Sequence, residues 1–415
     1  MERITATYFI ETPYPPEKAA EVLAGEQSSG TFVAVPGETE ALKQRFAARV
    51  ENVETLETVD RPAIPGAVSK EGKYNRAIVK VSWSIENFGY NLPVMVSTLQ
   101  GNLYEIQQFT GLKLMDVELP SSFVEYFKGP AFGIDGCRKL TDVYNRPLIG
   151  TIIKPSIGLS SEETASIVEQ LATAGIDFIK DDELMSSSAN SSFNDRVDSV
   201  MKVINIHADR TGKKIMYAFN ISGEMDEMLQ RYEKILNSGG TCAMVSINSC
   251  GLSATKKICD QRQLAIHAHR NGWGMMNRHP LLGIDFRAYQ KIWRLAGVDQ
   301  LHVNGIQNKF WESDDSVVNS INACLTPLLN QHTILPVVSS GQWGGQAFET
   351  WRRTQTTDLL YMAGGGIMAH SSGAAAGVKA LQQAWQAAAG GMSLNEAATL
   401  FKEFGESVQK FGKQQ

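Results

Sequence analysis

The run Gly175-Ile-Asp-Phe-Ile-Lys-Asp-Asp-Glu183 places one lysine and three carboxylates together at the end of an apolar segment. A strand in a protein core tolerates charge only where it reaches the surface, and α/β enzymes build their sites at the carboxyl ends of strands. Carboxylate oxygens favour Mg²⁺, and the lysine could bind phosphate or, once carbamylated by CO₂, supply another oxygen ligand. The alternative is a solvated charge cluster at a boundary between a strand and a loop.

Other polar side chains occur at the ends of further β-rich segments. Lys154 follows one segment, and His267 and His269 stand at alternate positions of another, where they face the same way. His302 ends a third segment and is followed by a Gly/Asn-containing loop that carries Lys309. Spacing alone leaves two interpretations of Lys309 open, a solvated surface lysine or a mobile cationic lid.

Glycines and serines end the last two β-rich segments, as Ser339-Ser-Gly341 and Gly364-Gly-Gly366. In a barrel of parallel strands, the last two loops commonly cradle phosphate with backbone N–H groups. The two endings therefore predict a phosphorylated small-molecule substrate. A tight turn without a ligand is the alternative for the glycine run.

Eight β-rich segments must position these side chains, and longer amphipathic segments separate them. One intervening helix begins with capping-box chemistry at Ser160, and another, over Met225–Leu236, stops at Gly239-Gly240. Eight β/α units in series predict an α/β fold with a C-terminal (β/α)₈ TIM barrel. The predicted strands are Leu148–Ile153, Phe178–Lys180, Ile215–Phe219, Cys242–Ile247, Leu264–His269, Gln300–Val303, Ile334–Ser339 and Leu359–Ala363.

The first 130 or so residues lack this rhythm. Extended segments near Thr5–Ile10 and Ala77–Ile85 flank a helix around Pro16–Ala24, which predicts a separate α+β domain of the ferredoxin-like type. Glycine and proline gather from Gly129 to Gly136, so the domains are expected at residues 1–130 and 131–415.

Composition excludes several classes of partner. The 415-residue chain has a formal net charge of -5 and no block of Lys or Arg, which argues against nucleic acid and membrane surfaces. The N-terminus does not resemble a signal peptide, and no apolar run is long enough to span a membrane. The five cysteines are odd in number and form no CxxC pair, so reduced thiols and a cytoplasmic location are expected.

Taken together, the motifs resemble those of the ribulose bisphosphate carboxylase (RuBisCO) superfamily. The similarity also reaches the first domain, where Glu26–Phe32 and Gly101-Asn102 resemble segments that the family contributes to the neighbouring subunit's site. The resemblance therefore implies at least a homodimer with shared active sites. The barrel motifs that carry it are Thr151-Ile-Ile-Lys-Pro155 with Gly158-Leu-Ser160, Gly175–Glu183, His267-Ala-His-Arg270, His302 with Lys309, Ser339-Ser-Gly341 and Gly364–Gly366.

The resemblance also implies a role for each matching residue. Lys180 would be carbamylated by CO₂ and would hold Mg²⁺ with Asp182 and Glu183. Lys154 would be the acid/base that moves the proton, and His269 a second polar or acid/base group. The residues implied for substrate binding are Thr31, Lys309, Gly341, Gly365 and Gly366 at one phosphate, Arg270, His302 and Ser339 at the distal anion site, and Asn102 in the partner's site.

Departures from the carboxylase pattern narrow the chemistry. Ser156 stands where carboxylases have a second lysine, which removes a cation that aids CO₂ addition, so CO₂ fixation is not expected. Trp273 replaces a histidine, while Asn304 and Ser340 replace glycines around the loop that carries Lys309. The chain is therefore similar to the RuBisCO-like proteins of form IV, which form a metal-held enolate.

Within that group, Asn102 occupies the position of the base lysine in the methionine-salvage enolase, which argues against that enzyme. Arg270 and His302 keep cationic capacity opposite the phosphate end, which suits 3-oxo-isoapionate 4-phosphate. The resemblance thus implies its decarboxylase or its transcarboxylase/hydrolase. The alternatives are 2,3-diketo-5-methylthiopentyl-1-phosphate enolase, 5-methylthioribulose-1-phosphate isomerase, or a zinc-dependent TIM-barrel hydrolase that uses His267 and His269 as ligands.

Overall fold

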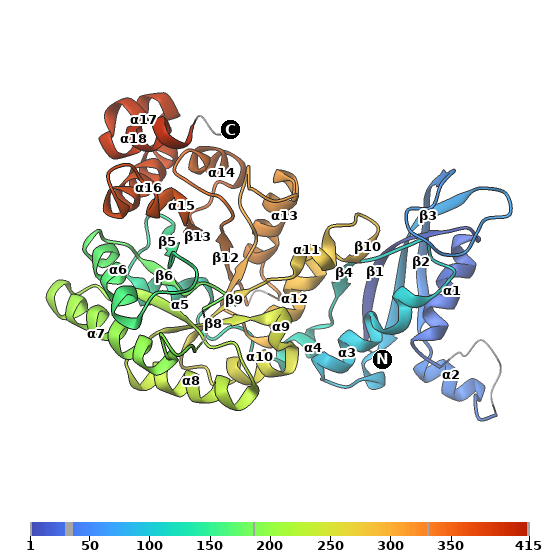
Figure 1. The fold of residues 1–415 in the computed structure, drawn as a ribbon. Helices are drawn as coiled ribbons and strands as arrows, with labels where there is room; N and C mark the ends of the chain where they lie inside the picture. The colour runs from blue at the N-terminus through green and yellow to red at the C-terminus, as the bar shows by residue number, and fades with distance from the viewer. Residues whose placement is uncertain (1, 30–35, 186, 330–331, 413–415) are drawn as a thin grey trace. The chain divides into compact units, whose positions relative to one another are not determined.

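The computed structural model describes residues 2–29, 36–185, 187–329 and 332–412. The chain divides into two compact units, each of which combines two stretches of sequence (Figure 1). Unit 1 consists of Met1–Lys128 and Gly272–Leu295, and unit 2 of Gly129–Asn271 and Ala296–Gln415.

Unit 1 is built on a five-stranded sheet in the order β10-β4-β1-β3-β2. Strands β4, β1, β3 and β2 pair antiparallel, and helices α1 and α3 connect β1 to β2 and β3 to β4, which is the predicted ferredoxin-like topology. The elements are β1 (Arg3–Thr12), α1 (Pro16–Glu26), α2 (Glu40–Phe46), β2 (Arg49–Val59), β3 (Tyr74–Ser84), the 3₁₀ helix η1 (Ile85–Asn87), α3 (Leu92–Leu99), the 3₁₀ helix η2 (Gly101–Glu105), β4 (Gly111–Glu118), α4 (Ser121–Tyr126), α11 (Trp273–Asn277), β10 (Leu282–Ile284) and α12 (Phe286–Ala296).

The fifth strand of this sheet comes from a distant part of the sequence. Strand β10 lies between the barrel strands β9 and β11 along the chain, and it pairs parallel with β4 in the register Leu282 to Leu112. The sequence pattern did not reveal this excursion, because a three-residue strand carries almost no periodicity.

Unit 2 is a closed barrel of parallel strands in the order β11-β12-β13-β5-β6-β7-β8-β9, which confirms the predicted (β/α)₈ fold. The barrel strands are β5 (Leu148–Ile152), β6 (Phe178–Lys180), β7 (Met216–Asn220), β8 (Cys242–Ser246), β9 (Ala265–His269), β11 (Gln300–His302), β12 (Leu335–Val338) and β13 (Leu360–Met362). The helices are α5 (Gly133–Thr141), α6 (Ser161–Thr173), α7 (Phe193–Thr211), α8 (Met225–Asn237), α9 (Ile247–Cys250), α10 (Leu252–Cys259), α13 (Asp314–Leu325), α14 (Gln346–Thr354), α15 (Gly365–Met368), α16 (Ala374–Ala389), α17 (Leu394–Leu400) and α18 (Lys402–Phe411).

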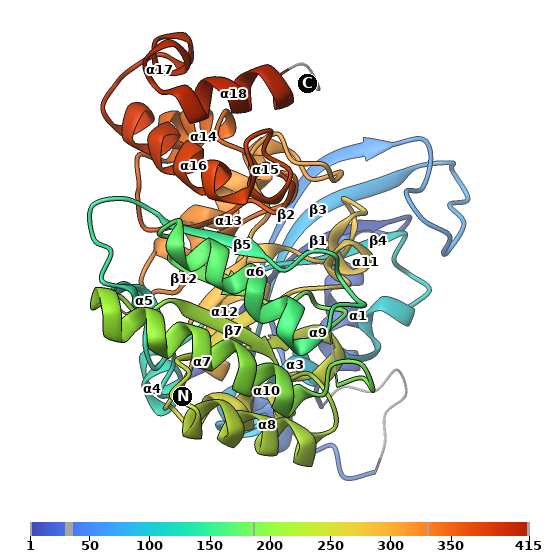
Figure 2. The ribbon, with the colours of Figure 1, turned by 60° about the vertical axis from the view of Figure 1, so that its left-hand side comes forward.

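Local sequence signals explain where the helices around the barrel begin and end. The Ser160 hydroxyl accepts from the Glu163 N–H and the Glu163 carboxylate accepts from the Ser160 N–H, which is the predicted capping box of α6. Helix α7 begins after the Ser192 cap and ends at Gly212, whose φ of 74° suits glycine. Helices α6, α7 and α8 lie side by side on the outside of the barrel (Figures 1 and 2).

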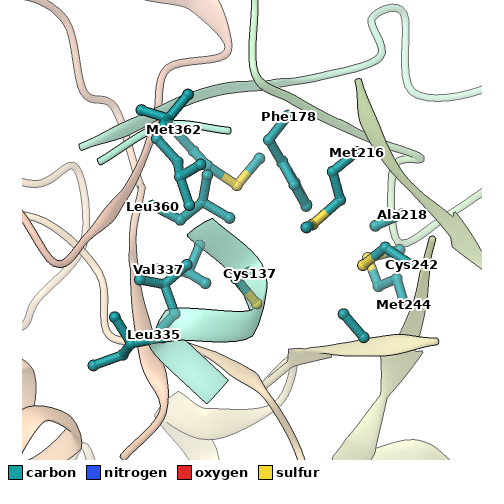
Figure 3. Close-up of a cluster of buried hydrophobic side chains, with 14 residues drawn as sticks. Cys137, Phe178, Met216, Ala218, Cys242, Met244, Leu335, Val337, Leu360 and Met362 are labelled. Atoms are coloured by element: carbon teal, nitrogen blue, oxygen red, sulfur yellow. The ribbon is translucent and has the colours of Figure 1, made fainter. Parts of the chain in front are cut away.

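Most side chains in the barrel interior below the carboxyl ends of the strands are apolar, and the buried His267 and Gln300 lie among them. Phe178, Met216 and Met244 point into a buried cluster that also contains Cys137 of α5, the short helix seen at its centre in Figure 3. Because side chains alternate along a strand, Phe178 and Lys180 share the inner face of β6. Along β6 the inward-facing side chain therefore changes from apolar at Phe178 to charged at Lys180.

Two further expectations concern the whole chain. No helix within the described residues is long and apolar enough to cross a membrane. All five cysteines are free thiols, and every one except the half-buried Cys250 is buried, as the sequence predicts.

Candidate active site

Lys180 lies at the center of a cluster of charged residues at the carboxyl end of β6. Its backbone pairs with Ile152 of β5 and Ala218 of β7, and its side chain is buried. The amine donates to the Asp181 backbone carbonyl oxygen at 2.9 Å and lies 3.4 Å from the Glu183 carboxylate. Burial lowers the pKa of Lys180, although the neighbouring carboxylates act in the opposite direction.

A tight turn after β6 sets the positions of Asp182 and Glu183. The Asp182 carboxylate accepts from the Leu184 N–H at 3.1 Å, and the Asn220 side-chain amide donates to the backbone oxygen of Glu183 at 3.2 Å. Asn220 ends β7, where the sequence gave no sign of a role in the site. From the adjacent strand β7, the Asn220 amide thus holds the backbone of the turn at Glu183 and helps to orient the Glu183 side chain.

Lys154 reaches the Asp182 carboxylate from the end of β5. Its amine donates to Asp182 Oδ2 and to the Ser156 hydroxyl, both at 2.7 Å, and its side chain is 43% exposed. Burial acts to raise the pKa of Asp182, but the hydrogen bonds from Lys154, Ser156 and the Leu184 N–H outweigh it, so this pKa is lowered. The structure thus brings Lys154, Lys180, Asp182 and Glu183 together, as the sequence predicts.

Asp181, the third carboxylate of the run, serves a different purpose. It is fully buried and accepts from Arg196 of α7 at 3.3 Å, from the Tyr217 hydroxyl at 2.6 Å and from the Asn220 N–H at 2.9 Å. The Asp181 carboxylate therefore ties β6 to α7 and β7, while its backbone oxygen accepts from the Lys180 amine.

Three histidines line the barrel next to this cluster. His269 Nε2 lies 3.5 Å from Glu183 Oε2, and the His269 ring packs against His302 with ring centres 4.7 Å apart. Deeper in the barrel, His267 Nε2 and His302 Nε2 are 2.9 Å apart. Burial lowers the pKa of His269 to about 3 and holds those of His267 and His302 well below 6.5, so all three rings are neutral near pH 7.

The residues expected at the distal anion site also lie together. His302 Nδ1 is 3.1 Å from the Ser339 hydroxyl, which links the ends of β11 and β12. Arg270 follows β9, is buried, and forms an ion pair of 3.1 Å with Glu312. Glu312 was not predicted as a site residue, because its position after the Lys309 loop carries no strand-end signal.

The loop after β12, expected to bind phosphate, contacts both the Lys309 loop and the glycine run after β13. The Lys309 N–H donates to the Ser340 carbonyl oxygen at 3.3 Å, and a Cβ at Gly341 would lie 3.3 Å from that of Lys309. Gly365 begins the short helix α15 and has open space where a Cβ would stand, whereas a Cβ at Gly366 would come within 2.6 Å of the Gln342 backbone oxygen. Gly365 therefore offers room for a ligand, and Gly366 permits the close packing beneath it.

Unit 1 holds the remaining predicted residues. Asn102 is exposed on η2, and Glu26 is exposed at the end of α1. Thr31 lies outside the described residues. The structure therefore leaves the side chains of Asn102 and Glu26 free to meet another molecule.

The donor set around Lys180 fits a hard cation better than zinc. The described residues contain no group of three or more His, Cys, Asp or Glu side chains placed to hold a metal. Both ring nitrogens of His267, which the zinc hydrolase would use as a ligand, already lie within hydrogen-bond distance of Gln300 and His302, which argues against that alternative. Asp182 and Glu183 supply two carboxylates, and a carbamate on Lys180 would add the third oxygen ligand.

Family models match both parts of the chain. Residues 2–123 match the ribulose bisphosphate carboxylase large chain, N-terminal domain, and residues 133–411 match the catalytic domain of that large chain.

Individual proteins extend this similarity over nearly the full length. The chain is 52% identical to 3-oxo-isoapionate-4-phosphate transcarboxylase/hydrolase of Xanthobacter autotrophicus, over 96% of each chain, and 46% identical to 3-oxo-isoapionate-4-phosphate decarboxylase of Rhizobium rhizogenes, over 98% of each. The crystal structure of a rubisco-like protein from Burkholderia fungorum is similar with a TM-score of 0.92 at 42% identity and covers 99% of this chain and 100% of its own. The octameric ribulose-1,5-bisphosphate carboxylase/oxygenase of Pyrococcus horikoshii OT3 gives 0.89 at 31% identity, with 100% and 94% covered.

Proposed function

The chain belongs to the ribulose bisphosphate carboxylase large-chain family, and from that premise we propose that it is a Mg²⁺-dependent enzyme that forms an enolate from 3-oxo-isoapionate 4-phosphate. The observation that carries the proposal is the buried Lys180 amine beside Asp182 and Glu183. Burial favours the neutral amine, which is the form that reacts with CO₂ to give a carbamate. The names of the two isoapionate relatives support the choice of substrate.

The residues divide the chemistry between them. Lys180 as its carbamate, Asp182 and Glu183 would hold Mg²⁺, which when bound would stabilise the enolate oxygens. The Lys154 amine reaches the same region from β5 and would donate or accept the proton at the reacting carbon. Neutral His269 lies beside Glu183 and would hydrogen-bond a substrate hydroxyl or carbonyl without adding charge.

The phosphate would lie where the loops after the last strands offer backbone groups and one flexible cation. Gly365 leaves open space, Gly366 and Gly341 allow the close approach of the chain, and Lys309 is exposed beside Gly341. Thr31 of the partner subunit would join them. This arrangement would anchor one end of the substrate and leave its carboxyl group for the cluster around Lys180.

Assembly is the second part of the proposal. One solved relative is an octamer, in accord with a homo-oligomer. We propose that the chain forms at least a homodimer in which Asn102, Glu26 and Thr31 of one subunit complete the partner's site. The exposure of Asn102 and Glu26 supports this.

Turnover of 3-oxo-isoapionate 4-phosphate carrying ¹³C in its carboxyl group tests the activity directly. The enzyme is incubated with Mg²⁺ and bicarbonate, and the label is followed by ¹³C NMR. Release of labelled CO₂ identifies a decarboxylase, whereas label retained in a product carboxylate identifies a transcarboxylase/hydrolase. No conversion, together with enolisation of the methylthio diketone phosphate, would refute the assignment.

A lysine variant and its matched control test the site. Lys180→Ala is expected to abolish Mg²⁺-dependent turnover while the far-UV circular dichroism stays unchanged. Lys213 also pairs with a carboxylate, Asp177, yet lies at the amino end of β7, so Lys213→Ala should retain turnover. Substantial activity in Lys180→Ala would show that the carbamate is not required.

A further inference from the structure

Glu312 neutralises the cation at the distal end of the pocket. The Arg270 guanidinium and the Glu312 carboxylate form an ion pair of 3.1 Å, and their side chains are 4% and 0% exposed. Such a pair presents little net charge to a ligand, and the low polarity around it makes the compensation stronger than it would be in water.

Two departures from the carboxylase pattern hold Glu312 in place. The Asn304 side-chain amide donates to Glu312 Oε2 at 2.5 Å, and the Ser340 hydroxyl donates to Asn304 Oδ1 at 2.7 Å. The family resemblance implies glycines at both positions in the carboxylases, and here both residues have positive φ, 64° at Asn304 and 74° at Ser340. Side chains are disfavoured in that conformation, so their presence here is explained by the hydrogen bonds that they add.

The hydrogen bonds of His267 and His302 also make the distal end a poor site for an anion. The Gln300 side chain faces Met216 Sδ at 3.2 Å, and a thioether only accepts, so Gln300 Nε2 must point there and Gln300 Oε1 must accept from His267 Nδ1 at 2.8 Å. His267 Nε2 is then an acceptor, and His302 Nε2 must be the donor across their 2.9 Å contact.

The chain of donors ends at Ser339. With its proton on Nε2, His302 accepts at Nδ1. The Ser339 hydroxyl therefore donates its only hydrogen to His302 Nδ1, at 3.1 Å. Ser339 is left with acceptor capacity toward the pocket, and the neutral His302 adds no charge. An anion needs donors and positive charge, whereas a hydroxyl group can donate to Ser339.

We propose that the distal end formed by Arg270, His302 and Ser339 recognises the uncharged hydroxyl end of a sugar monophosphate, and that Glu312 is the specificity residue that excludes a second phosphate. The inference deepens the proposed function, since it takes the phosphate to bind at the Gly365 end. A phosphate placed at the distal end would face the Glu312 carboxylate and an acceptor hydroxyl. The pocket would therefore gain little from the second phosphate of a bisphosphate.

Calorimetric titration with ribulose 5-phosphate and ribulose 1,5-bisphosphate, which share one carbon skeleton, tests this on the full-length protein with Mg²⁺ and bicarbonate. Wild type is expected to prefer the bisphosphate by less than tenfold. Glu312→Gln keeps the shape of the side chain and removes its charge, so its preference for the bisphosphate should rise at least tenfold over wild type. Glu312→Gln combined with Arg270→Met should lose that gain.

Three results would overturn the proposal: a wild-type preference of tenfold or more, a gain below tenfold in Glu312→Gln, or a gain that persists without Arg270. Should Glu312→Gln fail to fold, the wild-type preference decides the matter. If wild type binds neither sugar measurably, the preference of Glu312→Gln itself decides the matter: tenfold or more for the bisphosphate is expected, and less would overturn the proposal. The titration measures binding and not turnover. The role of Glu312 would therefore be supported or refuted even if the protein did not convert 3-oxo-isoapionate 4-phosphate, so failure of one proposal can be told from failure of the other.

Discussion

Replacing Arg196 with methionine tests whether Asp181 is a structural carboxylate. The substitution keeps an unbranched side chain of similar length on α7 but removes the cation, while Asp181 stays fully buried. Removal of one partner from a buried ion pair costs about 3–5 kcal/mol, because the other charge is left uncompensated.

Two observations place the expected loss of unfolding free energy at the lower end of that range. Asp181 keeps its hydrogen bonds from the Tyr217 hydroxyl and the Asn220 N–H, and the Arg196 nitrogens it loses are both at 3.3 Å, which is long for a strong bond. We therefore expect the free energy of unfolding to fall by about 3 kcal/mol.

Urea unfolding at one fixed protein concentration, followed by far-UV circular dichroism, measures this loss. Arg353→Met is the matched control, because its partner Asp315 is 85% exposed, and a change within about 0.5 kcal/mol is expected there. Turnover per folded Arg196→Met enzyme should stay close to wild type, since the Asp181 carboxylate keeps its hydrogen bonds from Tyr217 and Asn220, and its backbone oxygen still accepts from the Lys180 amine. A loss below about 1 kcal/mol, or one equal to that of Arg353→Met, would refute the reasoning.

Three other outcomes follow from the site. Lys154→Met should abolish turnover but retain Mg²⁺ binding in calorimetry; loss of binding would instead make this lysine a structural residue. Gly365→Ala should leave the unfolding midpoint unchanged but raise KM, whereas Gly366→Ala should lower the midpoint because its Cβ meets a backbone oxygen at 2.6 Å; equal midpoints would contradict this. The low pKa values of His267 and His302 mean that the folded state binds fewer protons than the unfolded chain below pH 6.5, so stability should fall as pH drops from 7 to 5.5, and His267→Gln should flatten that slope.

The sequence predicted the barrel and most of the cluster because both depend on local patterns. All eight strands fall within a residue or two of their predicted bounds, since apolar runs between amphipathic helices mark them clearly. Lys154, Lys180, Asp182 and Glu183 meet because parallel strands of a barrel bring their carboxyl ends to one face.

What the sequence did not show depends on long-range partners. Asn220 reaches Glu183, 37 positions away, and Glu312 reaches Arg270, 42 positions away, and neither residue type by itself marks a site. The carboxylates of Asp181, Asp182 and Glu183 look equivalent in sequence, yet the Asp181 carboxylate pairs with Arg196. Only the neighbouring strand and helix decide that direction.

The path of the chain between β9 and β11 limits how the protein can be divided. A cut after Lys128 would remove β4 and leave β10 without its pairing strand, so a fragment beginning at Gly129 would carry an exposed strand edge. Unit 1 is therefore not a detachable module. A chimera that exchanges it with a relative should transfer Gly272–Leu295 as well, so that β4 and β10 come from the same protein.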